Sequence, residues 1–506
     1  MKKKKKPTLS VRRALNNKII LKLSIIIIIF IIVIVFFIIN NHQKDNLNNN
    51  SQYYIGNLYS ANQAANMLDH YTSENAVISP LNVNSTLAIL YNSTDNNTNK
   101  ELKKYFRSTS NEVNKQLTTK LKSFINEEKI TNEYTELYEE YMQKIEDSKY
   151  HNLTSSTIKL LSTSEKRTLQ ELLEKINLIH DYLNNKNDLS IKYIEDYKIT
   201  DDVITNEYTL ESLLTKVLDD YETFSINNKI VNYHELFVSN DLDTINENYL
   251  DDLSQYNTSI THLDLTDSLN TSSYINDKIK ETTDNNISRV IEPKDINSQN
   301  LMINSFYFNY EWANSISSNN VKDEEFYELN GDISQVEMMY SKESKYLENN
   351  VARGFIKDFQ NGQYSYVGVL PKSEGDFTLS SLNLDSLLES VKEENITIGL
   401  PKYSLSSEVP IVDLLKDQNI SEVFTSKANF TKITDQDFSL TKNIQATYFQ
   451  IGEKGTYQSE IRVTNFESYT EEEDEKKIIL NRPFCFLVIN NETKDILLIG
   501  KIKTFN

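Results

Sequence analysis

The stretch that decides the fold lies near the C-terminus, at residues 444–498. It includes Ile451-Gly-Glu-Lys-Gly-Thr-Tyr-Gln-Ser-Glu460, and later Asn481-Arg-Pro-Phe-Cys-Phe-Leu-Val-Ile-Asn490 and Ile496-Leu-Leu-Ile-Gly-Lys501. Apolar and β-branched residues favour strands, so we expect one strand before the first segment and two strands in the later ones. A long acidic and polar run separates them. This order predicts an exposed segment whose two ends are held by strands.

Composition and charge argue against several functions. The 506 residues include 73 acidic and 53 basic side chains, a formal net charge of −20. Such a surface disfavours nucleic acid, so we expect no nucleic-acid partner. The single cysteine, Cys485, allows no intrachain disulfide. Six scattered histidines without a cysteine pair predict neither a metal site nor a metal cofactor.

Residues 19–40 are predicted to be a transmembrane signal-anchor. Leu23–Ile39 is an almost unbroken apolar run, which with Ile19–Leu21 approaches the roughly 20 residues that span a bilayer. Basic residues precede this run, and no acidic residue does. The positive-inside bias therefore places residues 1–18 in the cytosol and residues 41–506 outside the cell or in a lumen. A cleaved signal peptide is the competing interpretation, but the sequence after the run offers no small-residue cleavage site.

The rest of the chain predicts an α+β fold. Residues 41–56 form a polar linker, and residues 57–125 are mainly helical, with Ser79 as the N-cap of a helix and Pro80 at its first position. Residues 127–222 form a charged block with apolar residues at helical spacing. After residue 224, short strands alternate irregularly with helices. Asn-x-Ser/Thr sequons fit a glycosylated ectodomain; they include Asn92, Asn152, Asn257, Asn270, Asn286, Asn395, Asn419 and Asn491.

Several motifs, taken together in this order, resemble the serpin family. Asn75-Ala-Val-Ile-Ser-Pro-Leu-Asn82 is similar to the family's Asn-x-x-x-Ser-Pro-x-Ser segment. Leu301-Met-Ile-Asn-Ser-Phe-Tyr-Phe-Asn-Tyr-Glu-Trp312 is similar to its Leu-x-x-Asn-x-x-x-Phe-x-x-x-Trp strand. Further matches are Val336-Glu-Met-Met339, Gly399-Leu-Pro-Lys-Tyr403, Glu453-Lys-Gly-Thr456 and Arg482-Pro-Phe484. The resemblance covers roughly residues 57–126 and 223–506.

The resemblance implies three β-sheets, eight or nine helices and an exposed reactive loop at about residues 453–480. The domain would span residues 57–506, with the block at about 127–222 as a helical insertion. A serpin of this kind is not an enzyme. It acts as a suicide substrate of a serine protease, whose cleavage of the loop is followed by insertion of the loop into a sheet.

By this resemblance, Glu453, Lys454, Gly455 and Thr456 form the hinge of the loop. Side chains alternate across a strand, so Gln458, Glu460 and Arg462 would follow Thr456 into the core. Inhibitory family members have small residues at the early positions. Unpartnered burial of these polar groups would cost about several kcal/mol in total, which slows insertion without forbidding it.

The scissile bond stays open between two counts. Counting forward from Glu453 gives Tyr469-Thr470, and Tyr469 would suit a chymotrypsin-like protease. Counting back from Pro483 gives a position near Glu472, which would suit an acid-specific protease. We favour Tyr469-Thr470.

The resemblance also marks a region where the sheet opens, comprising Asn75, Ser79, Pro80, Asn82, Asn304, Trp312 and Gln445. The family usually has Ser at the position of Asn82 and His at that of Gln445, and this His bonds the Asn that corresponds to Asn304. A hydrogen bond between Gln445 and Asn304 could replace that contact, because each amide donates and accepts. The predicted function is serine-protease inhibition outside the cell or in a lumen; the alternative is a non-inhibitory serpin-fold surface protein for binding or adhesion.

Overall fold

A computed structural model of the chain describes the part of the sequence that carries the fold. The described residues are 60–118, 121, 162–164, 167, 228–456 with breaks at 257, 284, 298–299, 361 and 416–419, and 476–505. The predicted anchor at 19–40, the linker at 41–56 and nearly all of the block at 127–222 lie outside these residues. Among the described residues, no helix is both long enough and apolar enough to span a bilayer.

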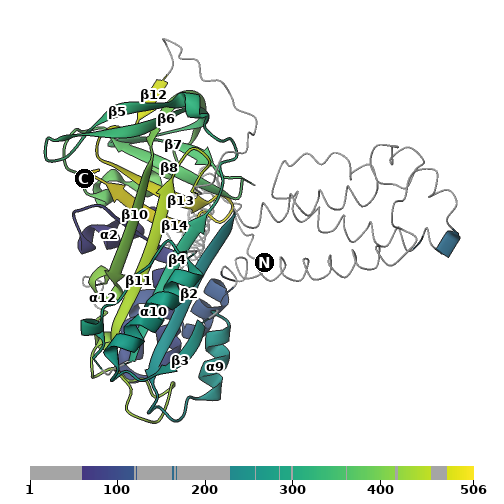
Figure 1. Ribbon diagram of the computed structural model, residues 1–506, viewed down its shortest axis with the longest axis vertical. Coiled ribbons are helices and arrows are strands. Elements are labelled where there is room, and N and C mark those ends of the chain that lie inside the picture. The colour runs from purple at the N-terminus through teal and green to yellow at the C-terminus, as the bar shows by residue number, and fades with distance from the viewer. Residues whose placement is uncertain are drawn as a thin grey trace, which may run out of the picture. The chain divides into compact units, whose positions relative to one another are not determined.

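A five-stranded sheet forms one layer of the domain (Figure 1). Its strand order is β10 (Tyr403–Pro410), β11 (Leu440–Ile451), β4 (Asn300–Asn309), β2 (Lys229–Ser239) and β3 (Thr258–Leu263). β4 lies at the centre and is buried along its whole length, as its apolar and aromatic sequence predicts. β10 pairs with β11, and β2 with β4, in antiparallel fashion, whereas β4 and β11 are parallel.

The other strands form a nine-stranded sheet, so the described residues make two hydrogen-bonded sheets where three were expected. The difference arises because β6 (Ile333–Glu348) is long enough to join two groups of strands: β5 and β9 pair along its length, and β7 pairs with its last residues. In its pairing with β9, β6 has a register shift between Glu343 and Lys345, just where its pairing with β7 begins. The remaining bounds are β1 (Ala76–Ile78), β5 (Val321–Tyr327), β7 (Ala352–Asp358), β8 (Tyr364–Pro371), β9 (Lys392–Pro401), β12 (Lys476–Ile479), β13 (Phe484–Asn490) and β14 (Ile496–Ile502).

A buried helix, α3 (Pro80–Ser93), supports the five-stranded sheet from within. Ser79 is its N-cap and Pro80 its first residue, as predicted, and all of its residues are buried. The other α-helices are α2 (Ala61–Tyr71), α4 (Asn96–Phe106), α9 (Glu247–Ser254), α10 (Ser268–Thr282), α11 (Leu384–Leu388) and α12 (Ile411–Leu414); 3₁₀ turns span Pro293–Asp295, Ser318–Asn320, Leu379–Leu382 and Glu422–Phe424. The lone thiol, Cys485, is fully buried in β13.

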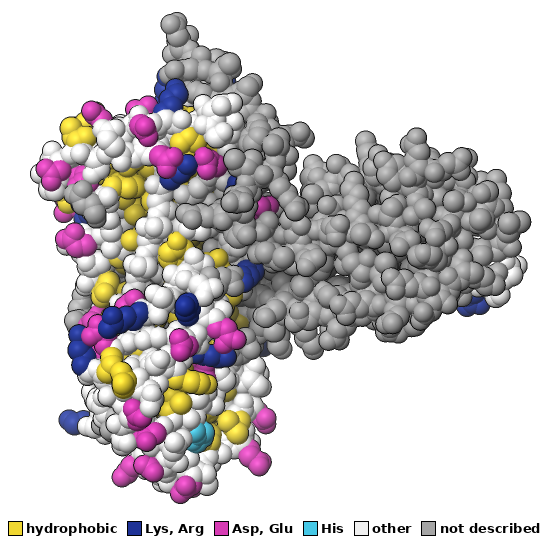
Figure 2. Space-filling model, in the orientation of Figure 1, with side chains coloured by type: hydrophobic (Ala, Val, Ile, Leu, Met, Phe, Trp, Pro, Cys, Tyr) yellow, Lys and Arg dark blue, Asp and Glu magenta, His cyan; other side chains and the backbone are white. Residues whose placement is uncertain are grey.

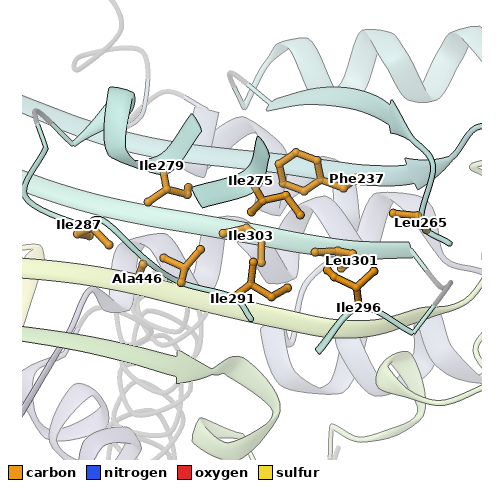
Figure 3. Close-up of a cluster of buried hydrophobic side chains, with 11 residues drawn as sticks. Phe237, Leu265, Ile275, Ile279, Ile287, Ile291, Ile296, Leu301, Ile303 and Ala446 are labelled. Atoms are coloured by element: carbon orange, nitrogen blue, oxygen red, sulfur yellow. The ribbon is translucent and has the colours of Figure 1, made fainter. Parts of the chain in front are cut away.

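The opposite face of the five-stranded sheet is covered by α10 and the segment that follows it. Figure 3 shows Ile275 and Ile279 of α10 with Ile291 of that segment, packed over side chains of β2, β4 and β11. An ion pair of 2.5 Å between Asp295 and Lys442 also joins this segment to β11. The cover therefore lies across the line where β4 and β11 meet.

Candidate reactive-loop hinge and sheet-opening region

The line between β4 and β11, here called the seam, is the feature around which the site is built. The two strands run parallel, with Ile303 opposite Ile444 and Tyr307 opposite Tyr448. A chain that turned back after β11 would run antiparallel to both strands. Antiparallel pairing is slightly more stable per residue than parallel pairing. An added strand at the seam would therefore replace one parallel contact by two antiparallel ones.

A tight turn over Gly452–Gly455 follows β11. The backbone N–H of Gly452 donates to the carbonyl of Gly455 over 2.8 Å. Gly455 has a φ of +129°, and a Cβ there would overlap the carbonyl oxygen of Tyr310. Only glycine fits this backbone without strain. The predicted pivot is therefore fixed by close contact with the end of β4.

Thr456 sits at the upper end of the seam and is only 1% exposed. Its N–H donates to the Tyr310 carbonyl at 2.9 Å, and its hydroxyl accepts from the Tyr310 N–H at 2.6 Å. Its carbonyl accepts from the Gln450 side chain of β11 at 2.7 Å. Its hydroxyl also donates to the Asn309 side chain at the end of β4 at 3.2 Å, so Thr456 is bonded to both strands that border the seam.

Trp312 lies beside this hinge rather than in the polar cluster around Asn304. Its backbone N–H donates to the Lys454 carbonyl at 2.7 Å, and its indole N–H donates to the Gly452 carbonyl at 2.9 Å. Roughly 25 Å of extended chain separates it from Asn304. Trp312 therefore holds the turn in place, and it lies apart from the predicted sheet-opening residues around Asn304.

An ion pair holds the first hinge residue. The carboxylate of Glu453 lies 3.0 Å from the Lys402 ammonium, which also contacts Glu337 at 2.9 Å. Burial alone would lower the pKa of Lys402. The hydrogen bonds to Glu337 and Glu453 and the charges of these carboxylates outweigh burial and raise the pKa. The hinge is consequently linked through Lys402 to Glu337 of β6 in the nine-stranded sheet.

Gln445 does not bond Asn304, so the predicted replacement of the family's histidine contact is wrong. Its amide oxygen accepts from the Ser79 N–H at 3.0 Å, and its amide N–H₂ donates to the Ser79 carbonyl at 2.9 Å and the Asn82 side chain at 2.9 Å. Gln445 and Asn304 are opposite in register. The longer Gln side chain nevertheless reaches the N-terminus of α3 instead.

Asn82 connects both sides of the seam. Its side-chain N–H₂ donates to the Ser305 carbonyl of β4 at 3.2 Å and to Asn232 of β2 at 2.9 Å. Its side-chain oxygen accepts from Gln445 of β11. A serine at this position would be too short for all of these contacts. The departure from the family residue at 82 thus matches the departure at 445.

A buried histidine that sequence reasoning missed completes the cluster. His234 of β2 lies opposite Asn304 in register, with its Nδ1 2.9 Å from the Asn304 side-chain oxygen and 3.2 Å from the Thr86 hydroxyl. Its Nε2 lies 3.2 Å from the Asn232 amide nitrogen. Burial lowers the pKa of His234 to about 4, so the ring is neutral. No local motif marks it; only alignment of β2 with β4 in register would have found it.

Asn304 also closes the seam directly. Its side-chain N–H₂ donates to the Asn443 side chain of β11 at 2.6 Å and to the Ile444 carbonyl at 3.3 Å. His234 therefore acts on the seam through Asn304, which it holds from the β2 side. The resemblance places the family's histidine contact on β11. Here the histidine contact comes from β2, on the other side of β4.

Other predicted site residues lie elsewhere. Asn75 bonds the C-terminal segment, since its side chain donates to the Thr504 carbonyl at 2.8 Å and accepts from the Lys503 N–H at 2.6 Å. It precedes β1, and the extended backbone of β1 carries the chain away from it before Ser79. The predicted scissile bond Tyr469-Thr470 lies outside the described residues.

Comparison with known proteins identifies the family. The model of the family described as "Serpin (serine protease inhibitor)" matches residues 157–504, which is more than half of the chain. The chain therefore belongs to the serpins, a family of serine protease inhibitors. The match begins inside the block at 127–222, so the bounds of the predicted insertion stay a prediction.

Relatives and solved structures agree with this assignment. Neuroserpin of Homo sapiens is 26% identical over 54% of this chain and 70% of its own length, and the serine protease inhibitor of Cyanea capillata is 28% identical over 45% and 63%. Native tengpin, a thermophilic serpin, superposes with a TM-score of 0.61 at 19% identity, covering 88% of this chain and 94% of its own. Thyroxine-binding globulin in complex with thyroxine gives a TM-score of 0.60 at 16% identity, covering 88% and 98%. The fold is thus shared with tengpin and with thyroxine-binding globulin.

Proposed function

We propose that this protein inhibits a serine protease as a suicide substrate, through a reactive loop at about residues 453–480 with Tyr469-Thr470 as the scissile bond. The protease would cleave the loop and be held as an acyl-enzyme while the freed strand enters the seam. The serpin supplies no nucleophile or base, so it is not an enzyme in this proposal.

One observation carries the proposal. Thr456 is buried and bonded to Asn309 of β4 and to Gln450 of β11, at the end of a seam that an antiparallel strand would fill. In the proposed mechanism Thr456 enters the sheet first, and it already lies at the end of the seam. A loop used only as a display surface would not need its first residue in that position.

The test is to mix the protein with chymotrypsin-, trypsin- and elastase-like proteases on a denaturing gel. We expect a band at the summed mass and loop cleavage after Tyr469. Thr456→Arg should abolish the covalent band but leave loop cleavage. Thr456 is 1% exposed, and a charged arginine cannot be buried at this position without a partner. Thr456→Ser, which keeps the hydroxyl, should retain the band. Loop cleavage of the wild type with neither a covalent band nor a rise in melting temperature would refute insertion.

A non-inhibitory role in surface binding or adhesion is the second candidate. It is supported by the polar residues Gln458, Glu460 and Arg462 at positions that would have to be buried. The gel experiment separates the two candidates, because a binding protein would give cleavage without trapping.

The proposed site of action is outside the cell or in a lumen. The apolar run at 19–40 and the basic residues before it support a single-pass anchor with its N-terminus in the cytosol. The target would then be a protease that meets the membrane-tethered ectodomain.

A further inference from the structure

The hairpin formed by β5 and β6 exposes apolar side chains at its tip. Tyr327 ends β5 and is 47% exposed, and Ile333 begins β6 and is 55% exposed. The two residues are directly paired in the antiparallel register, so their side chains lie next to each other on one face. Leu329 in the connecting turn is 37% exposed. Such a cluster on an otherwise polar surface is typical of a contact with another protein.

Carboxylates continue the same face along the hairpin. Residues two apart on a strand share a face, which places Glu325 and Asp323 beside Tyr327, and Glu337 on the neighbouring strand. All three are exposed. Figure 2 shows acidic and apolar side chains together at the end of the domain that carries β5 and β6. We call the surface made by Asp323, Glu325, Tyr327, Leu329, Ile333 and Glu337 the hairpin face.

The hairpin face is connected to both ends of the loop. At the entry, Glu337 shares the Lys402 ammonium with Glu453 of the hinge. At the exit, the Tyr327 N–H donates to the carbonyl of Asn481 at 2.9 Å, shortly after the loop segment ends. Residues 457–475 of the loop itself contain Glu471-Glu-Glu-Asp-Glu475 and only one basic residue, Arg462. The loop and the hairpin face thus carry the same sign of charge.

We propose that the hairpin face is a secondary docking site for the target protease, and that this protease has a basic surface beside its active-site cleft. The proposal rests on the proposed function, because it requires a protease on the loop. Carboxylates of the hairpin face would steer the basic partner, and Tyr327 and Ile333 would be covered in the complex. Charge complementarity of this kind acts mainly on the association rate.

The test measures association of the full chain with anhydrochymotrypsin, whose catalytic serine has lost its hydroxyl, so that docking is observed without cleavage. The double variant Tyr327→Ser/Ile333→Ser should dissociate about five- to tenfold faster. Asp323→Asn/Glu325→Gln should associate more slowly, and its association should be less sensitive to salt. Leu269→Ser, at an apolar residue of α10 that is 68% exposed, is the matched control and should leave both rates unchanged.

Charge complementarity is tested on the protease side with succinylated anhydrochymotrypsin, which keeps its cleft but loses its basic surface. We expect it to bind the wild type more slowly and to lose the difference between wild type and Asp323→Asn/Glu325→Gln. Anhydrotrypsin is measured in parallel, so that the result does not depend on one primary specificity. Ile333→Thr keeps a β-branched residue in the strand and tests the contact if the double variant does not fold.

Three outcomes overturn the proposal. The first is equal binding rates for the wild type and the hairpin variants. The second is no association of the wild type with anhydrochymotrypsin or anhydrotrypsin. The third is a wild type that sediments as a dimer while the double variant sediments as a monomer. The last would assign the hairpin face to a second copy of this chain. Trapping is scored separately with active chymotrypsin: docking that depends on the hairpin face without a covalent band would support the docking site and reject suicide inhibition.

Discussion

At the scale of single residues, the hinge depends on the absence of a side chain at Gly455. Gly455→Ala should destabilise the native state, because it combines a strained φ of +129° with overlap on Tyr310. Gly331→Ala is the matched control, since Gly331 also has a positive φ, of +89°, but no atom lies within 4 Å of its added Cβ. We expect strain of about 1–3 kcal/mol in both variants and a larger loss at Gly455. Urea unfolding measures the difference, and equal losses would contradict a role for the Tyr310 contact.

His234 should make stability depend on pH. Burial lowers its pKa to about 4 in the folded state, against about 6.5 in an unfolded chain. The unfolded state therefore takes up the proton first as the pH falls. The contribution of neutral His234 to the free energy of unfolding is fully present above pH 6.5. It is lost as the pH falls towards 4, which lowers the free energy of unfolding by about 3 kcal/mol.

The variant His234→Gln isolates this effect. It keeps a polar side chain towards Asn304 but cannot titrate, so its unfolding free energy should fall less between pH 7 and pH 4.5 than that of the wild type. Parallel pH dependence in the two proteins would show that other groups dominate acid destabilisation.

At the scale of elements, the packing of α10 and the segment after it over the seam should supply a large part of the stability of the five-stranded sheet. Ile291 lies in the buried cluster between α10 and the sheet (Figure 3). Ile291→Ala should cost about 2–4 kcal/mol in thermal or urea unfolding, because it leaves a cavity. Leu269→Ala on the exposed side of α10 should cost less than about 0.5 kcal/mol. Similar losses for both would mean that the cover packs only loosely.

The N-terminus of α3 gives a second prediction at this scale. Asn82→Ser restores the residue that is usual in the family, but it removes the contacts with Ser305 and Asn232 and leaves part of the Gln445 amide without a partner. We expect a loss of about 1–3 kcal/mol in urea unfolding. Unchanged stability in the single variant would show that Asn82 does not hold the seam closed.

Elements could be predicted from the sequence where the pattern is local. The helix that starts at Ser79-Pro80 and the strand around 301–308 are confirmed, because capping residues and buried apolar runs act through near neighbours. The pairing of His234 with Asn304 and the actual partners of Gln445 could not be predicted. They depend on strand register and on side-chain reach between elements far apart in the sequence, which local pattern does not encode.

At the scale of the whole molecule, the proposed anchor at 19–40 predicts a defined topology. In membrane vesicles from a eukaryotic host, the full chain should resist carbonate extraction, and its C-terminal domain should be protected from added protease. Deletion of residues 1–40 should abolish membrane retention. Extraction of the full chain by carbonate would refute the anchor. Accessibility of the C-terminal domain in sealed vesicles would refute its orientation.

Glycosylation is a further prediction of the proposed topology. Asn395 is exposed on β9, next to Ile396, which pairs with Lys476 at the end of the loop segment. Asn92 is 6% exposed and bonded to Asn114 at 2.6 Å, so its sequon should stay unmodified. Treatment with an N-glycosidase should therefore shift the mass of the protein, and Asn395→Gln should remove part of the shift while Asn92→Gln should not. A shift carried by Asn92 would contradict burial of α3 at the time of modification.

Cys485 offers a way to observe the lifetime of the folded state. The sulfur is fully buried in a central strand, and burial raises the pKa of its thiol, so the reactive thiolate is suppressed while the sheet is intact. A thiol reagent can reach it only when the nine-stranded sheet opens. Because no other cysteine competes, the labelling rate at this single atom would act as a clock for global unfolding, read by mass spectrometry without any engineered probe.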